Sequence, residues 1–337
     1  MADHPPRKTP SAPPLVGRLA PSPTGAQHIG NARTFLLAWL SIRSRGGTLL
    51  LRMEDIDSPR VKSWGAEQAL EDLEWLGLDW DEGPDRGGPR GPYVQSLRLD
   101  RYREALAALQ RSEQVYPCTC SRSDVASAAS APHRGAEGII YPGTCAGRSV
   151  AAARALETAG RRFAWRFRMP RRNEPLHDRF AGTRTCDWRG DLGDFVVFKS
   201  DGTPAYQLAV VVDDAAMGVT EVVRGDDLLP STFRQLALYR FFDWSPPAFY
   251  HVPLVVGRDG RRLAKRHGDT RLASLRRAGV SATDLVGYLA HSCGLLPEPR
   301  PVRAEDLIDR FDFDRVTRTP WTWDDRSMAT WMRDRAS

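Results

Sequence analysis

Two segments far apart in the chain carry side chains that can handle a nucleoside triphosphate. The first, Arg18–Gly25, contains two prolines and ends in a glycine, and His28, Gly30 and Asn31 follow it. Small residues let a ligand approach the backbone, amide groups at a helix start face an anion, and His28 can donate to a phosphate. Taken alone, a histidine beside a proline-rich turn is more often an ordinary surface residue.

The second segment is a basic loop at 256–268, which carries five cations at neutral pH. A basic loop can clamp the oxygens of a triphosphate during transfer. Clusters of this kind also occur as solvated hairpins or as loops that contact RNA.

Three of the five cysteines, Cys118, Cys120 and Cys145, lie close together in the sequence. Zinc takes four ligands in a tetrahedron, so three thiolates leave one position for His133 or Tyr141. On chemistry alone His133 is the more usual ligand. The alternative is three scattered buried thiols without a metal, because Cys-x-Cys is a less specific signal than paired Cys-x-x-Cys.

The elements expected around these residues alternate between strand and helix. The spacing predicts a strand at 16–20, a helix at 29–45, a strand at 48–53 and a helix at 66–76. This order is typical of a parallel sheet with crossover helices. Further elements are expected at 99–110 (helix), 162–169, 195–198 and 219–223 (strands), 231–242 (helix) and 250–256 (strand), with helix beyond about 270.

The composition is that of an ordinary globular protein, with 41% hydrophobic and 27% charged residues in 337. The net charge of +6 is compatible with a polyanionic partner but does not require one. We expect a cytoplasmic protein, because no apolar run is long enough for a membrane span and the start lacks the apolar stretch of a signal peptide. A monomer is expected as well. Cys186 and Cys293 are expected in the core.

Together, the two phosphate-handling segments resemble those of the class I aminoacyl-tRNA synthetases. The stretches 18–25, 52–57, 206–214 and 222–228 are similar to the glutamyl branch of that family. Two departures from its motifs stand out. The His-Ile-Gly-His element ends here in Asn31, and the Lys-Met-Ser-Lys-Ser loop keeps Lys265 but has Ala264 in place of a serine.

The resemblance implies a glutamate pocket in which Arg18 and Arg224 each grip one carboxylate, in either order. It implies that Glu54 binds the ammonium group and that Tyr206 contributes a hydroxyl to the pocket. The alternative for Arg18 and Glu54 is that they form ordinary surface ion pairs. Further glutamate contacts are implied for Leu19, Ala20, Pro21 and Ser22. ATP with Mg²⁺ is implied at His28, Gly30, Asn31, Arg262 and Lys265, of which His28 and Lys265 are the implied catalytic residues.

Within the glutamyl branch, Cys-x-Cys followed by Tyr-x-x-x-Cys resembles the glutamyl-queuosine tRNA(Asp) synthetases. In that group the tyrosine completes one structural Zn²⁺ site, which favours Cys118, Cys120, Tyr141 and Cys145 here. Only 71 residues follow Arg266, so we expect no anticodon-binding domain. The resemblance then implies that L-glutamate, activated by ATP, is transferred to queuosine in the anticodon of tRNA(Asp).

Two other functions stay open at this point: a conventional synthetase that charges the 3′ end, and an inactive relative that binds nucleotide or RNA. For all three, the resemblance implies a Rossmann-type, doubly wound parallel α/β sheet with an insertion. The expected parts are a disordered leader (1–14), the first half of the catalytic domain (15–115), an inserted zinc-binding subdomain (116–190), the second half with the basic ATP loop (191–268) and a helical C-terminal subdomain (269–337).

Overall fold

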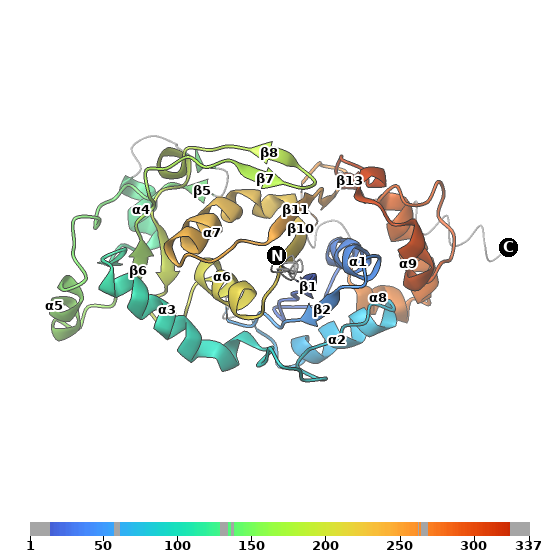
Figure 1. Cartoon of the computed structure of the whole chain (residues 1–337), viewed down its shortest axis with the longest axis horizontal. Helices are drawn as coiled ribbons and strands as arrows, with labels where there is room; N and C mark the ends of the chain where they lie inside the picture. The colour runs from blue at the N-terminus through green and yellow to red at the C-terminus, as the bar shows by residue number, and fades with distance from the viewer. Residues whose placement is uncertain are drawn as a thin grey trace, which may run out of the picture.

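The computed structural model describes residues 14–56, 61–128, 134–135, 138–261, 263 and 269–323. His133, Arg262 and Lys265, to which the sequence assigns roles, therefore lie outside the described residues. Figure 1 shows an elongated molecule in which a central sheet lies between a helical part at one end and a second, smaller sheet at the other.

The central sheet is parallel and brings together the two halves of the predicted catalytic domain. Its strands are β1 (Val16–Leu19), β2 (Thr48–Leu51), β10 (Glu221–Gly225) and β11 (Ala248–Val252). β1 pairs with β2 and β10 pairs with β11, and the Thr220 amide joins the pairs by donating to the Val16 carbonyl at 2.9 Å. The run Leu49–Leu51 is fully buried, as expected for a strand covered on both faces.

Helices cover both faces of this sheet, which confirms the predicted α/β fold. They are α1 (Ile29–Arg43), α2 (Gly65–Trp75), α3 (Leu99–Arg111), α6 (Tyr206–Ala216) and α7 (Leu229–Phe241). The sequence analysis did not assign α6, because its residues are apolar on almost every face and show no helical period. Its residues from Leu208 to Asp214 are all buried.

The inserted region forms a second, antiparallel sheet, β3 (Val115–Cys118), β6 (Ala164–Phe167) and β9 (Phe195–Phe198), in that order. Because β9 pairs with β6, this sheet extends past residue 190, the expected end of the insertion. The smaller elements are α4 (Arg122–Ala128), β4 (Arg134–Gly135), β5 (Gly138–Ile139), α5 (Ala152–Thr158) and the hairpin β7 (Leu176–Asp178) with β8 (Gly182–Arg184).

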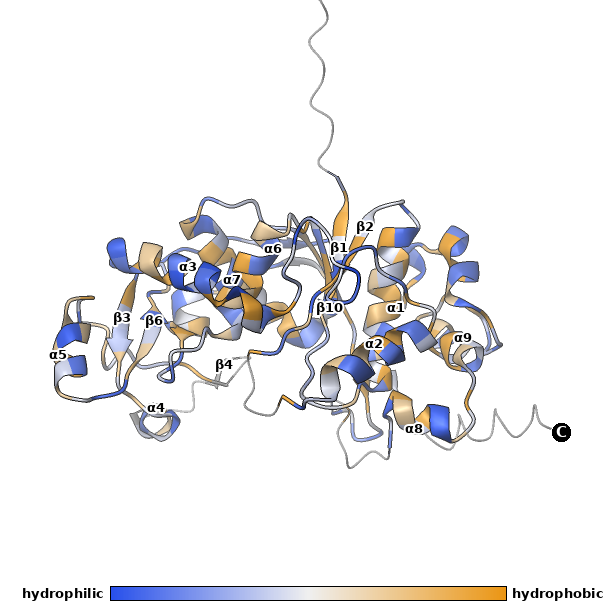
Figure 2. Cartoon of the chain, turned by 90° about the horizontal axis from the view of Figure 1, so that it is seen from below, coloured by the Kyte–Doolittle hydropathy of each residue, from blue (hydrophilic) through white to orange (hydrophobic). Residues whose placement is uncertain are grey.

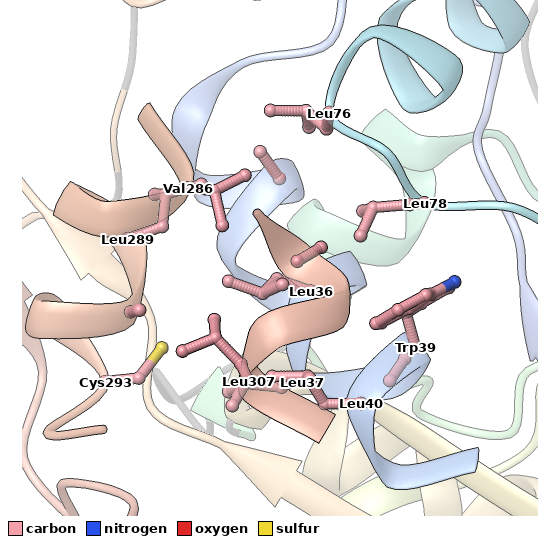
Figure 3. Packing of buried hydrophobic residues seen from close by; sticks show 14 of the residues in the cluster. Leu36, Leu37, Trp39, Leu40, Leu76, Leu78, Val286, Leu289, Cys293 and Leu307 are labelled. Atoms are coloured by element: carbon pink, nitrogen blue, oxygen red, sulfur yellow. The ribbon is translucent and has the colours of Figure 1, made fainter. Parts of the chain in front are cut away.

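The C-terminal region packs directly on α1 and shares its core. It contains α8 (Leu272–Arg277), α9 (Ala282–Ser292), two 3₁₀ helices at Ala304–Arg310 and Phe313–Arg315, and the strand β13 (Trp321–Thr322). β13 pairs in parallel with β12 (Val255–Val256), so this region is not helical throughout. Figure 3 shows Leu36 and Leu37 of α1 facing Leu289 of α9 and Leu307 of the first 3₁₀ helix.

In Figure 2 the strand β1 is coloured mainly as hydrophobic. The helices α3 and α8 carry hydrophilic and hydrophobic residues side by side. Among the described residues, no helix is both long enough and apolar enough to cross a membrane.

Candidate active site

A pocket of about 410 Å³ opens at the carboxyl ends of β1, β2 and β10. This is the edge where open parallel sheets bind ligands. Nine of the residues singled out in the sequence line it: Arg18, Ala20, Ser22, His28, Gly30, Asn31, Glu54, Tyr206 and Arg224. The remaining wall includes Thr34, Phe35, Leu254 and Val255, which the sequence did not single out, and Asp227, which lies within the stretch 222–228 but had no expected role.

Leu19 and Pro21 do not line the pocket, although both were expected to contact glutamate. The Leu19 side chain lies in the hydrophobic core, because successive side chains of a strand point to opposite faces. Both residues act through their backbone. The Leu19 carbonyl accepts from the Arg52 amide at 2.9 Å, and the Pro21 carbonyl accepts from the Glu54 amide at 3.0 Å.

Arg224 is buried, and neutral groups accept hydrogen bonds from two of its three guanidinium nitrogens. Its Nε donates to His251 Nε2 at 3.1 Å, and its Nη2 donates to Thr232 Oγ1 and Gln235 Oε1, each at 2.7 Å. Nη1 has no partner among the described residues. A buried donor without an acceptor is costly, so this nitrogen is suited to a carboxylate ligand.

Arg18 reaches the same pocket from the neighbouring strand. Its Nη1 donates to the Val223 carbonyl at 3.2 Å, whereas Nε has no partner in the described part of the chain. Burial lowers the pKa of Arg18, and the nearby guanidinium groups of Arg52 and Arg224 act in the same direction. An anionic ligand would offset both effects.

Glu54 lies beside these cations, where Arg52 Nη2 donates to its Oε1 at 2.9 Å. Burial raises the pKa of Glu54, and the charges of Arg52 and Arg18 act in the opposite direction. Arg52 is itself buried and pairs with Asp214 of α6 at 2.6 Å. Both residues lie within the stretches that resemble the glutamyl branch, 52–57 and 206–214, but no role was expected for them.

The charges of this group leave one positive charge in excess. The charge of Arg18 interacts with two other guanidinium groups, Arg52 and Arg224, and with two carboxylates, Glu54 and Asp214. Three positive charges therefore face two negative ones. A second buried pair, Arg98 and Asp213 at 2.6 Å, is balanced within itself. Asp227 also lines the pocket, so this excess belongs to the cluster around Arg18 and not to the whole pocket. Glutamate, with two carboxylates and one ammonium, carries one net negative charge, opposite in sign to the excess of that cluster.

His28 begins α1 as its N-cap. Its Nδ1 accepts from the amides of Gly30 at 3.0 Å and Asn31 at 3.3 Å, and Asn31 Oδ1 accepts from the His28 amide at 3.3 Å. An imidazole that accepts at Nδ1 carries its proton at Nε2, so His28 is a donor at that atom. A side chain at position 30 would meet the imidazole at 2.9 Å, which explains the glycine there.

The basic loop begins and ends at this pocket, although Arg262 and Lys265 are not among the described residues. Before the loop, Leu254 and Val255 line the pocket. After it, the Thr270 carbonyl accepts from the Ile29 amide at 3.0 Å, and the Leu272 amide donates to the Gln27 carbonyl at 2.9 Å. Both ends are thus fixed beside the start of α1.

The three predicted cysteines meet in the inserted region, where the Sγ atoms of Cys118, Cys120 and Cys145 all lie within 4.8 Å of one another. The Tyr141 hydroxyl lies 3.4 Å from Cys118 Sγ and 3.7 Å from Cys120 Sγ, and it accepts from the Cys145 amide at 2.8 Å. The Sγ atoms of Cys120 and Cys145 are 3.6 Å apart. Two thiolates bound to the same tetrahedral zinc, each at about 2.3 Å, would lie ~3.8 Å from one another, which is close to this distance. The cluster can therefore bind zinc.

The thiols differ in acidity before any metal binds. Burial acts to raise the pKa of Cys145. Hydrogen bonds from the Thr119 backbone and from Tyr141 to its sulfur outweigh burial, so that the pKa falls to about 7. Burial raises the pKa of Cys120 to about 11. Zinc binds thiolates, so metal binding would release protons from this cluster.

Residues 14–330 match the family described as tRNA synthetases class I (E and Q), catalytic domain. The chain is 54% identical over 307 residues to the glutamyl-Q tRNA(Asp) synthetase of Symbiobacterium thermophilum. The matched region covers 91% of this chain and 95% of that protein. It is 51% identical over 294 residues to the protein of that name from Nitratidesulfovibrio vulgaris, covering 87% of this chain and 91% of the relative.

The fold is also that of a solved glutamate tRNA ligase from Elizabethkingia meningosepticum, whose structure holds its amino acid. The TM-score is 0.81 at 27% identity, over 96% of this chain and 69% of the other. Sequence and structure therefore agree, and the chain belongs to the class I tRNA synthetases, in the family whose catalytic domains serve glutamate (E) and glutamine (Q).

Proposed function

We propose that the chain activates L-glutamate with ATP and transfers it to queuosine in tRNA(Asp). The observation that carries the first step is the pair of buried arginines, Arg18 and Arg224, each with a guanidinium nitrogen that no described residue satisfies. Glu54 lies in the same pocket. Two cations and one anion at this spacing complement the two carboxylates and the ammonium of glutamate.

In this site the glutamate α-carboxylate attacks the α-phosphate of ATP, and pyrophosphate leaves. The triphosphate lies at the N-terminus of α1, where the positive end of the helix dipole and the Nε2 proton of His28 face developing negative charge. The amides of Ile29, Gly30 and Asn31 already donate to acceptors within the protein. Lys265 and Arg262, on the loop that begins and ends at the pocket, neutralise the phosphate oxygens. Mg²⁺ accompanies the ATP and supplies further charge neutralisation.

The proposed acceptor is supported by relatives named glutamyl-Q tRNA(Asp) synthetase, which are 54% and 51% identical to this chain over most of their length. We further propose that Cys118, Cys120, Tyr141 and Cys145 hold one structural zinc, and that the protein acts as a monomer in the cytoplasm. With zinc bound, the cluster would tie β3 to the loop that carries Cys145.

The test of activation is glutamate-dependent exchange of pyrophosphate into ATP, measured without tRNA. The test of the acceptor uses radiolabelled glutamate with tRNA(Asp) from which the 3′-terminal adenosine has been removed enzymatically. Trimming leaves queuosine intact, so label that survives trimming and disappears with queuosine-free tRNA(Asp) is the expected result.

The other functions give different outcomes. Label that is lost on trimming identifies a conventional synthetase that charges the 3′ end. No exchange, whether tRNA is absent or present, identifies a relative that only binds nucleotide or RNA.

A further inference from the structure

The inserted region reaches the glutamate pocket through a buried histidine that lies outside the stretches singled out in the sequence. His251, on β11, lies behind Arg224, and both are nearly inaccessible to solvent. On its other side is Asp178, the last residue of β7. The hairpin β7–β8 lies against β11, because the Arg179 amide donates to the Phe249 carbonyl at 2.8 Å.

Asp178 determines which ring nitrogen of His251 carries the proton. His251 Nδ1 lies 2.6 Å from Asp178 Oδ2. Both carboxylate oxygens accept from the His251 amide at 3.2 Å, and Oδ1 also accepts from the Phe180 amide at 2.9 Å. Burial acts to raise the pKa of Asp178, but hydrogen bonds from His251 lower it below its ordinary value. A carboxylate only accepts, so Nδ1 must be the protonated nitrogen.

The other ring nitrogen is then an acceptor for Arg224. With the proton on Nδ1, Nε2 has a lone pair, and Arg224 Nε donates to it at 3.1 Å. Thr232 Oγ1 lies 2.9 Å from the same nitrogen and also accepts from Arg224 Nη2. Burial lowers the pKa of His251, so the ring is neutral and does not repel the guanidinium.

This arrangement leaves Arg224 oriented but not neutralised. His251, Thr232 and Gln235 occupy Nε and Nη2 with neutral acceptors, so the positive charge and the Nη1 donor are left for a ligand. A carboxylate in the place of His251 would pair with Arg224 and compete with the substrate. A protonated imidazole would push the guanidinium away.

We infer that Asp178 and His251 are positioning residues for glutamate recognition: Asp178 fixes the tautomer of His251, and His251 in turn holds Arg224 Nη1 ready for a substrate carboxylate. The inference rests on the proposed glutamate site. It makes the hairpin of the inserted region part of amino-acid selection, although Asp178 does not line the pocket.

Two substitutions of the same histidine separate positioning from packing. His251→Asn keeps a donor near the position of Nδ1, for Asp178, but has no atom near Nε2. His251→Gln places an amide oxygen near Nε2, where it can accept from Arg224 Nε. We expect the KM for glutamate in pyrophosphate exchange to rise about ten- to hundredfold in the Asn variant. The Gln variant should stay within about threefold of wild type, and the KM for ATP should change in neither.

His177→Gln is the matched control, because His177 is exposed on the same hairpin and should leave both KM values unchanged. If His251→Asn does not fold, Asp178→Asn provides the same test. Its amide can donate to Nδ1 and so move the ring proton to Nε2, which should raise the KM for glutamate about tenfold.

Equal KM values for glutamate in the Asn and Gln variants, with normal melting temperatures, would overturn the positioning role. So would an Asp178→Asn variant with an unchanged KM. Wild-type protein without glutamate-dependent exchange would instead reject the proposed function, so the two failures are distinguishable.

Discussion

Arg52 holds Glu54 through two nitrogens of one guanidinium, with Nη2 at 2.9 Å and Nε at 3.3 Å from the same carboxylate oxygen. Arg52 is fully buried and does not line the pocket, whereas Glu54 does. On its other side Arg52 pairs with Asp214, so α6 supports the pocket from behind. The proposed ammonium-binding carboxylate is thus placed by a residue that the ligand does not meet.

As the pH falls, binding of the substrate glutamate should begin to weaken at a higher pH than the pKa of a solvent-exposed Glu side chain would give. Burial raises the pKa of Glu54, so its carboxylate takes up a proton at a higher pH than a solvent-exposed one, and only the ionised form attracts an ammonium. The KM for glutamate should therefore rise as the pH falls, most steeply in the pH range just above the ordinary pKa. Glu54→Gln should raise this KM at neutral pH, by an amount equivalent to about 1.5–3 kcal/mol, and should flatten that rise.

Arg224→Leu should remove the charge-assisted contact that Nη1 makes with a substrate carboxylate, and should lower kcat/KM in glutamate-dependent pyrophosphate exchange by an amount equivalent to about 2–4 kcal/mol. Arg103→Leu, at an exposed arginine of α3, should leave exchange unchanged. Near-normal exchange in the Arg224 variant would show that the pocket is assigned to the wrong ligand.

The purified protein should contain about one zinc per chain, as one four-ligand site requires. Cys118→Ser or Cys145→Ser should lose the metal, as measured by elemental analysis, whereas Cys186→Ser and Cys293→Ser should keep it. Tyr141→Phe should weaken retention against a chelator, and His133→Ala should not. Retention that depends on His133 instead would make the histidine the fourth ligand, and metal-free protein with full activity would remove the zinc proposal.

The contribution of Asp72, on α2, to stability should fall as the pH rises from about 4 to 7. This side chain is buried, and neither carboxylate oxygen has a partner among the described residues. Burial raises its pKa from 3.8 to about 6, so the folded state binds its proton more tightly than the unfolded state does. The stabilisation is complete below pH 3.8 and is lost as the pH passes 6.

Chemical denaturation at several pH values should show this loss as about 1–3 kcal/mol. Asp72→Asn should remove it, and Asp100→Asn, at an exposed position on α3, should retain it. Parallel pH curves for wild type and Asp72→Asn would contradict the assignment.

Much of the pocket follows from local sequence. The proline-rich turn after β1 and the helix start at His28 carry their own signals, and β1 and β2 are short apolar runs around one helix. Parallel strands end at the same edge of a sheet, so Arg18 and Glu54 could be expected near each other. The cysteine spacing and Tyr141 likewise predicted a cluster that the structure brings together.

Other features depended on contacts between residues far apart in the chain. Helix α6 shows no periodicity, because Asp213 and Asp214 are buried with arginines from other elements rather than exposed on a polar face. Leu19 and Pro21 are neighbours of pocket residues in sequence, but the alternation of side chains along a strand turns Leu19 into the core.

Sequence alone determined which chemical groups this chain has for glutamate and ATP, because those groups lie in short motifs beside strand ends and a helix start. Only the tertiary structure decided how Arg224 is held. Asp178 and His251 are 73 positions apart, and His251 and Arg224 are 27 apart. Hydrogen bonds across such separations arise from the packing of a hairpin on a sheet edge, and no local pattern of residues encodes that packing.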